Sequence, residues 1–137
     1  MYLLKPLLAW LIAQVIKIII EACRNKKVDF KRIAGAGGMP SSHAALTSAL
    51  TAALWKDFGP NNPLVAVSTV FTLIVLYDAA GVRRAAGKQA AVLNRIIEEL
   101  TLHKQLSEKR LKELLGHTPL QVLAGILLGI LVGFFFR

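Results

Sequence analysis

Three long apolar blocks dominate the pattern of hydrophobic and polar positions along this chain. They cover residues 3–23, 64–82 and 119–136, and hold three, one and no charged residues respectively. Each block approaches the roughly 20 residues that a helix needs to cross the hydrocarbon core of a bilayer. A shorter block, residues 41–56, is rich in Ala, Leu and Thr, and either spans the membrane thinly or packs inside the other three.

Turn and loop signals between the blocks predict where each helix begins and ends. A basic, Gly-ending stretch, an Asp-Phe-Gly-Pro-Asn-Asn-Pro turn and a Gly-His-Thr-Pro break separate them. The expected helices cover about residues 3–23, 41–56, 64–84 and 118–136, with a charged helical arm over about residues 85–115. The pattern therefore predicts an all-α fold, a polytopic membrane bundle of four main helices within a single domain, residues 1–137.

Two further patterns concern how these helices associate. Gly125, Gly129 and Gly133 recur every four residues and predict a close-packing face on the last helix. The arm has a partly helical apolar stripe with mixed Lys and Glu opposite it. It would therefore lie at the membrane interface or in the cytoplasm, or else join two copies of the chain. A homodimer that completes the small bundle is compatible with both patterns.

The charge distribution predicts the orientation in the membrane. The formal net charge is +9, and the basic residues gather in the first and third connections. With four crossings these connections share one side, which the positive-inside rule makes cytoplasmic, leaving both termini outside. Composition therefore predicts an integral protein of a bacterial-type plasma membrane. Nucleic acid is not an expected partner, because no aromatic residues are interleaved with the basic ones.

Polar groups that could carry chemistry gather at the predicted cytoplasmic edge. They are Lys17 and Arg24 on the first helix, Ser41, Ser42 and His43 on the second, Asp78, Arg83 and Arg84 on the third, and His117 before the last. Cations and helix N-termini stabilise phosphoryl oxygens, and a histidine can be the nucleophile or the proton donor. No cluster of metal ligands is evident, so we expect neither a metal nor a cofactor.

Simpler interpretations exist for two of these groups. Ser41 and Ser42 could only cap a helix beside a structural His43. Asp78 could only form a local ion pair with Arg83 or Arg84.

Three motifs carry a resemblance to a known family. They are Gly-Gly-Met-Pro-Ser-Ser-His at residues 37–43, Tyr-Asp-Ala-Ala-Gly-Val-Arg-Arg at 77–84 and Leu-Gly-His-Thr-Pro at 115–119. In these the chain resembles the type 2 phosphatidic acid phosphatase superfamily, which includes vanadium haloperoxidases. It is most similar to the superfamily's small divergent bacterial and plant branch, over nearly its whole length.

The resemblance implies roles for individual residues. Lys17 and Arg24 match the spacing of the superfamily's first motif, although Asn25 replaces a proline there. By the same resemblance, Ser41 and the backbone that follows it bind phosphate, and His43 is the general acid. Ser42 stands where the superfamily motif has a glycine, and we expect it to bind phosphate as well. His117 is then the nucleophile.

Two departures from the superfamily pattern concern that nucleophile. Arg110 and Leu111 stand where the superfamily has a Ser-Arg pair, so Arg83 or Arg84 could supply the missing guanidinium. Gln121 stands where the superfamily has the Asp that orients the histidine, and a Gln accepts a hydrogen bond but adds no negative charge. Asp78 or Glu113 could supply that carboxylate instead.

These observations predict a membrane phosphatase for a lipid phosphate or diphosphate, acting through a phosphohistidine without a metal. The alternatives are a non-catalytic binder or transporter of anionic lipid head groups, and a structural membrane subunit. The sequence leaves the identity of the lipid open.

Overall fold

The computed structural model describes residues 2–25, 38–101 and 117–136, excepting the side chains of residues 24, 25, 82–86, 88 and 99–101. The helices are α1 (Leu4–Asn25), α2 (Ser42–Phe58), α3 (Pro63–Tyr77), the π-helical turn η2 (Asp78–Val82), α4 (Arg83–Thr101) and α5 (Pro119–Phe135). These described segments contain no β-strand, which confirms the all-α fold class.

Two helical segments are long and apolar enough to cross a membrane, namely Leu4–Cys23 and Pro63–Gly81. Helix α5 is also apolar but shorter. Large apolar side chains of α3, such as Val67 and Ile74, are exposed over more than half of their surface, as expected of a helix facing lipid. The four-span bundle remains a prediction.

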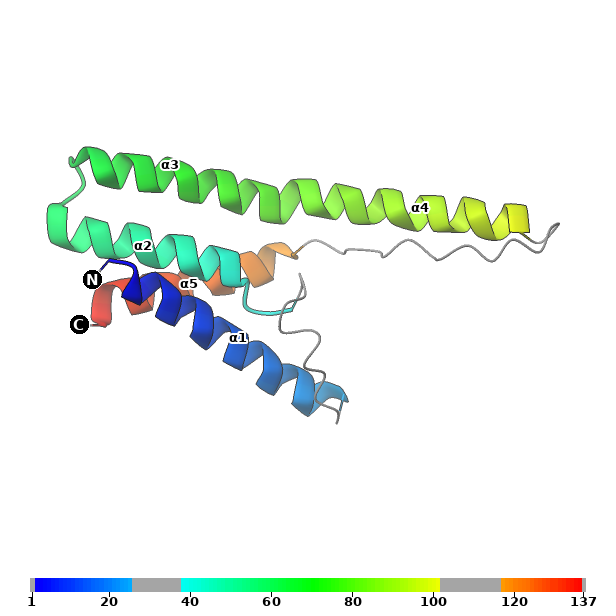
Figure 1. Ribbon diagram of the computed structural model, residues 1–137, viewed down its shortest axis with the longest axis horizontal. Coiled ribbons are helices and arrows are strands. Elements are labelled where there is room, and N and C mark those ends of the chain that lie inside the picture. The colour runs from blue at the N-terminus through cyan, green and yellow to red at the C-terminus, as the bar shows by residue number, and fades with distance from the viewer. Residues whose placement is uncertain (1, 26–37, 102–116, 137) are drawn as a thin grey trace.

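Helix α2 lies at the centre of the arrangement and contacts α1, α3 and α5 (Figure 1). The N- and C-termini lie at one end of this bundle, and α4 extends away from the other end. Helix α2 is therefore the element on which the others are positioned.

Close backbone packing joins α2 to α5. A Cβ atom added to Gly125 would meet the Ser41 carbonyl, and one added to Gly129 would meet the Ala45 carbonyl. At Gly133 the added atom would lie 2.6 Å from the Ala49 carbonyl oxygen. Both sets of residue numbers rise together, so the two helices run parallel and their N-termini lie side by side. The close-packing face predicted for the last helix is confirmed.

The other two contacts of α2 differ in character. Small side chains join α1 to α2 and α5, in a buried cluster of Ala9, Ala13, Ala45, Ala49 and Val132. Hydroxyls join α2 to α3: Thr51 Oγ1 and Thr72 Oγ1 lie 2.9 Å apart, and Thr72 also donates to the Thr47 carbonyl at 3.2 Å. Such hydrogen bonds stabilise helix pairs in lipid, where no water competes.

Two lysines bind the C-terminal end of α5, at the end of the bundle that carries the termini. Lys5 Nζ donates to the Gly133 carbonyl at 3.5 Å, and Lys56 Nζ donates to the Phe134 carbonyl at 2.6 Å. Both ammonium groups thus meet the last carbonyls of α5, where the helix dipole is negative.

The junction of α3 and α4 differs from the sequence-based expectation. We expected the third helix to end near residue 84 and a separate arm to follow. Instead α3, η2 and α4 form one continuous rod from Pro63 to Thr101 (Figure 1). The stretch contains no internal proline. From Asp78 the backbone becomes π-helical for one turn and then α-helical again, so the helix is not interrupted. Residues 102–115 of the predicted arm lie outside the described residues.

Candidate functional site

The first turn of α2 begins the candidate site. Ser41 is the N-cap, with its Oγ accepting from the Ala44 N–H at 3.4 Å, and the side chain is fully buried. The backbone N–H groups of this turn carry the positive end of the helix dipole. The simple capping interpretation of Ser41 is therefore correct for its side chain, but it leaves Ser42 and His43 to be explained.

Lys17 reaches this turn from α1. Its Nζ donates to Ser42 Oγ at 3.0 Å, and Ser42 is only 5% exposed. The aliphatic part of Lys17 passes close to Gly38, whose φ of 87° is a backbone conformation that favours glycine. Two of the predicted phosphate-binding residues, far apart in sequence, are therefore in direct contact.

His117 lies at the start of α5 and is only 3% exposed. Thr118 is the N-cap of this helix, and it forms a capping box with Gln121. The Gln121 side-chain oxygen Oε1 lies 3.2 Å from His117 Nδ1 and accepts from the Thr118 backbone N–H at 3.0 Å. Gln121, where the resemblance led us to expect a carboxylate, is thus itself a partner of the imidazole.

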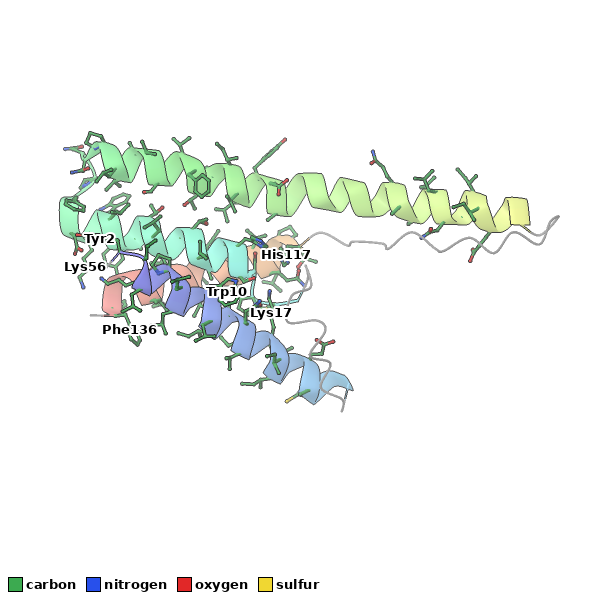
Figure 2. The ribbon with its side chains drawn as sticks, in the orientation of Figure 1. Tyr2, Trp10, Lys17, Lys56, His117 and Phe136 are labelled. Atoms are coloured by element: carbon green, nitrogen blue, oxygen red, sulfur yellow. The ribbon has the colours of Figure 1, made fainter. Side chains whose placement is uncertain are left out.

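The two helix starts are joined directly. The Ser41 N–H donates to the Gln121 carbonyl at 2.9 Å, one turn from the close contact between Gly125 and Ser41. Figure 2 shows Lys17 and His117 at the same end of the bundle, opposite the end that carries Tyr2, Lys56 and Phe136. An ammonium, a buried imidazole and two positive helix ends therefore share one region, which favours an anionic ligand.

The π-helical turn η2 packs against both helix starts. Ala79 belongs to a buried cluster with Ala44 of α2 and Val122 of α5. Asp78, half-buried, is the first residue of η2, and its backbone N–H donates to the carbonyls of Ile74 and Val75. Turns of this kind often occur at functional sites. The three family-like motifs thus approach one another at a single end of the bundle.

His43 differs from His117 in its surroundings. Its side chain is exposed, and its carbonyl accepts from Thr47 Oγ1 at 3.0 Å. It precedes Thr47 and Thr51 at intervals of four residues, so it lies near the face of α2 that contacts α3. His43 thus lies on the flank of α2 beside α3, whereas its neighbour Ser42 contacts Lys17 of α1.

Some predicted site residues cannot be placed as side chains. Arg24 lies in the last turn of α1, and Arg83 and Arg84 begin α4, but their side chains lie outside the description. Arg110, Leu111 and Glu113 lie outside the described residues altogether. Among the residues that are described, no group of three His, Cys, Asp or Glu side chains could hold a metal ion.

Sequence reasoning missed Thr118. Thr118 is the N-cap of α5, and its backbone N–H binds the Gln121 side-chain oxygen, which also contacts His117. The signal was present in the sequence: Thr-Pro-Leu-Gln has Thr at the N-cap, Pro at the first helical position and Gln at the third, which is typical of a capping box.

Comparison with known proteins agrees with these motifs. The model of the Divergent PAP2 family matches residues 1–132. The uncharacterized membrane protein YuiD of Bacillus subtilis (strain 168) is 39% identical in an alignment 149 positions long, which covers 98% of this chain and 94% of that protein. No solved structure matches the chain.

Proposed function

The chain belongs to the Divergent PAP2 family, and from this premise we propose that it is a membrane phosphatase for lipid phosphates or diphosphates. The observation that carries the proposal is the junction of α2 and α5. There Lys17 and Ser42 lie at one helix start and His117 at the other, with a direct backbone hydrogen bond between the two starts. Such an arrangement suits a tetrahedral anion beside a nucleophile.

In the proposed reaction His117 attacks the phosphorus atom. A nitrogen–phosphorus bond forms as the bond from phosphorus to the leaving oxygen breaks. His43 gives a proton to that oxygen, which belongs to an alkoxide when the substrate is a monophosphate and to the lipid monophosphate when it is a diphosphate. Water then attacks the phosphohistidine, its proton returns to His43, and inorganic phosphate leaves. Lys17 and Ser42 would hold the phosphoryl oxygens together with Arg24, Arg83 and Arg84, while Ser41 would contribute by capping the helix start whose backbone N–H groups favour an anion.

The contacts of Lys17 and Ser42 support this role. A phosphoryl oxygen could replace Ser42 Oγ as the acceptor of the Lys17 ammonium with little movement of either helix. A hydrogen bond to a charged group contributes about 1.5–3 kcal/mol, so a few such contacts would hold a phosphate firmly. The reaction as written needs no metal ion.

We also propose four membrane crossings, with the site at the cytoplasmic edge and both termini outside. The termini lie at one end of the bundle, and Lys17 and His117 at the other (Figures 1 and 2). The C-terminus of α1 and the N-terminus of α2, which the first basic stretch joins in sequence, lie at the end that carries the site, in agreement with the positive-inside rule. A homodimer would enlarge the lipid-embedded core of this small chain.

Phosphate release from lipid phosphates tests the proposal. The protein is purified, reconstituted in vesicles and given phosphatidate, a prenyl phosphate or a prenyl diphosphate, with and without a chelator. We expect release from at least one of them, insensitive to the chelator and inhibited by vanadate. His117→Ala should abolish it, whereas release that is unchanged in this variant contradicts the assignment of the nucleophile.

A second candidate function is binding or transport of an anionic lipid head group without turnover. Two observations favour it: His117 is only 3% exposed, and the uncharged Gln121 stabilises an imidazolium less than a carboxylate would. Saturable binding of lipid phosphate that is lost in Lys17→Met, with no phosphate release by the unaltered protein, would favour this function over hydrolysis.

A further inference from the structure

We infer that the π-helical turn η2 shifts the helical register so that Arg84, and not Arg83, lies on the row of the α3–α4 rod that faces α2 and α5. Arg84 is then the arginine at the level of His117. The inference deepens the proposed function, which assigns both arginines to the phosphoryl oxygens, and it rests on that function for its chemical meaning. The register itself is a property of the backbone and can be tested without any substrate.

A row of buried positions marks the side of the rod that packs against the bundle. Its members are Val65, Ser68 and Thr72 of α3 and Ala79 of η2. They follow one another at intervals of three, four and seven residues, which recur on one face of an α-helix. In an uninterrupted α-helix, residue 83, four positions after Ala79, would be the next on this row.

The π-helical turn changes this count. Its hydrogen bonds join residues five apart rather than four, so it takes up one residue more than an α-helical turn. Each position after η2 therefore has the direction that the preceding position would have in an uninterrupted α-helix, a rotation of about 100°. Arg84 thus takes the place on the row, and Arg83 lies about 100° away from it around the rod.

Two glycines agree with this shift. Gly87 is buried and lies eight residues after Ala79, whereas two turns of an α-helix take about seven residues. The additional residue is the one that the π-helical turn supplies, and it puts Gly87 one turn after Arg84 on the same face. Gly81 is exposed, with nothing within 4 Å of an added Cβ atom, as expected on the opposite side of the rod.

The level of Arg84 along the bundle follows from the contact between η2 and α5. Ala79 and Val122 belong to one buried cluster, and α3 runs antiparallel to α5 (Figure 1). Arg84 comes five residues after Ala79, and His117 comes five residues before Val122. Because the two helices run in opposite directions, both steps lead toward the same end of the bundle. The backbone of Arg84 therefore lies at the level of His117.

This placement matters because of what a guanidinium does. It remains charged at every physiological pH and can donate two parallel hydrogen bonds to a phosphate. From the row, Arg84 would approach a phosphoryl group at His117 from the side of η2, while Lys17 approaches it from α1. The anion would then be held between cations from two separate helices. Arg83 would contribute only to the surrounding positive potential.

Two matched substitutions give the first test. Arg84→Gln and Arg83→Gln remove the same charge one residue apart, and vanadate is the probe, because its binding requires no turnover. We expect Arg84→Gln to weaken vanadate binding about 10- to 150-fold, the loss of one charge-assisted contact. Arg83→Gln should weaken it less than about fivefold, as for an exposed charge. Equal losses, or a larger loss in Arg83→Gln, would overturn the inference.

A single inserted residue tests η2 itself. One alanine inserted after Gly81 rotates everything beyond it by about a further 100°, which brings Arg83 to the row in place of Arg84. In this protein Arg83→Gln should become the damaging change and Arg84→Gln should have little effect. A general disturbance of the structure would not exchange the two roles. Continued dependence of vanadate binding on Arg84 would overturn the inference.

Deletion of Gly81 covers the case in which the insertion prevents folding. The deletion removes the additional residue, so η2 can become α-helical while Arg84 keeps its place on the row. Vanadate affinity and its dependence on Arg84 should both persist. Transfer of that dependence to Arg83 in the folded deletion protein would contradict the proposed register.

Cross-linking tests the register without any ligand. In a Cys23→Ser background, His117→Cys is combined with Arg84→Cys or with Arg83→Cys, and the two thiols are joined by a short bis-maleimide. We expect the pair with Arg84→Cys to cross-link faster, because both positions lie on facing surfaces at one level. Faster cross-linking of the pair with Arg83→Cys would overturn the inference.

Activity then separates this inference from the proposed function. Cross-linking and vanadate binding that single out Arg84, in a protein that hydrolyses no lipid phosphate, would contradict the proposed function alone. Hydrolysis that depends on Arg83 and not on Arg84 would contradict the inference alone.

Discussion

Lys17 Nζ donates to Ser42 Oγ at 3.0 Å, and this contact joins the C-terminal half of α1 to the first turn of α2. The superfamily motif that the chain resembles has a glycine at the position of Ser42. The Ser42 hydroxyl gives the Lys17 ammonium a partner when no anion is bound. Elsewhere α1 packs on α2 and α5 through small and apolar side chains. Lys17 is therefore held at the place where the proposed phosphate would bind.

Replacing Lys17 tests the electrostatics of the site. Lys17→Met keeps much of the apolar length but removes the charge, and the loss of one charge-assisted hydrogen bond of about 1.5–3 kcal/mol should weaken vanadate binding about 10- to 150-fold. Vanadate inhibition or direct binding by calorimetry measures the change. Lys17→Arg is the matched control and should retain most of the affinity, whereas equal losses in both variants would argue against a role for the charge.

Replacing Gly129 tests the close packing of α2 and α5. The added methyl group of Gly129→Ala would meet the Ala45 carbonyl and Ser48, so the helices must separate, at a cost of about 1–3 kcal/mol. Reversible unfolding in detergent measures this loss. Gly81→Ala is the control, because nothing lies within 4 Å of the added atom, and it should leave stability unchanged or slightly higher. Similar stability in the two variants would contradict the packing described.

A double-mutant cycle tests the hydroxyl contact between α2 and α3. Thr51→Val and Thr72→Val each remove one partner of the 2.9 Å contact while keeping the shape of the side chain. We expect a coupling free energy of about 0.6 kcal/mol, the usual size for polar contacts between membrane helices. Additive effects would show that the two hydroxyls contribute independently.

Replacing Lys56 tests its contact with the C-terminal end of α5, at the end of the bundle opposite the candidate site. Its ammonium donates to the Phe134 carbonyl at the end of α5, where a cation stabilises a helix by about 0.3–1 kcal/mol. Lys56→Met should lower the free energy of unfolding by that amount and leave the vanadate affinity unchanged, because the site lies at the other end. A weakened vanadate affinity would mean that this contact also shapes the site.

Much of the helical organisation follows from local sequence. The apolar blocks predicted the regions of α1, α3 and α5, because length and hydropathy are properties of each segment alone. The glycine stripe of α5 predicted a close-packing face for the same reason. The family-like motifs correctly indicated which segments of the chain meet, including the approach of residues near Ser41 to residues near His117.

Other features depend on contacts that no local pattern contains. The end of the third helix was placed near residue 84 because the composition changes there, yet helical backbone continues through η2 into α4. A change from apolar to charged residues marks a change of surroundings and need not mark a helix end. The contact between Lys17 and Ser42 depends on the angle between two helices. The contact between Gln121 and His117 depends on the side-chain conformation that Gln121 adopts in the capping box of α5.

Trapping of the phosphorylated protein tests the central claim most directly. The reconstituted protein is mixed with a ³²P-labelled lipid phosphate, quenched in alkali within one turnover and separated under denaturing conditions. We expect an alkali-stable, acid-labile label on the unaltered protein, absent from His117→Ala and formed more slowly by His43→Ala. Phosphate release without any such label, or a label that persists in His117→Ala, would contradict the account.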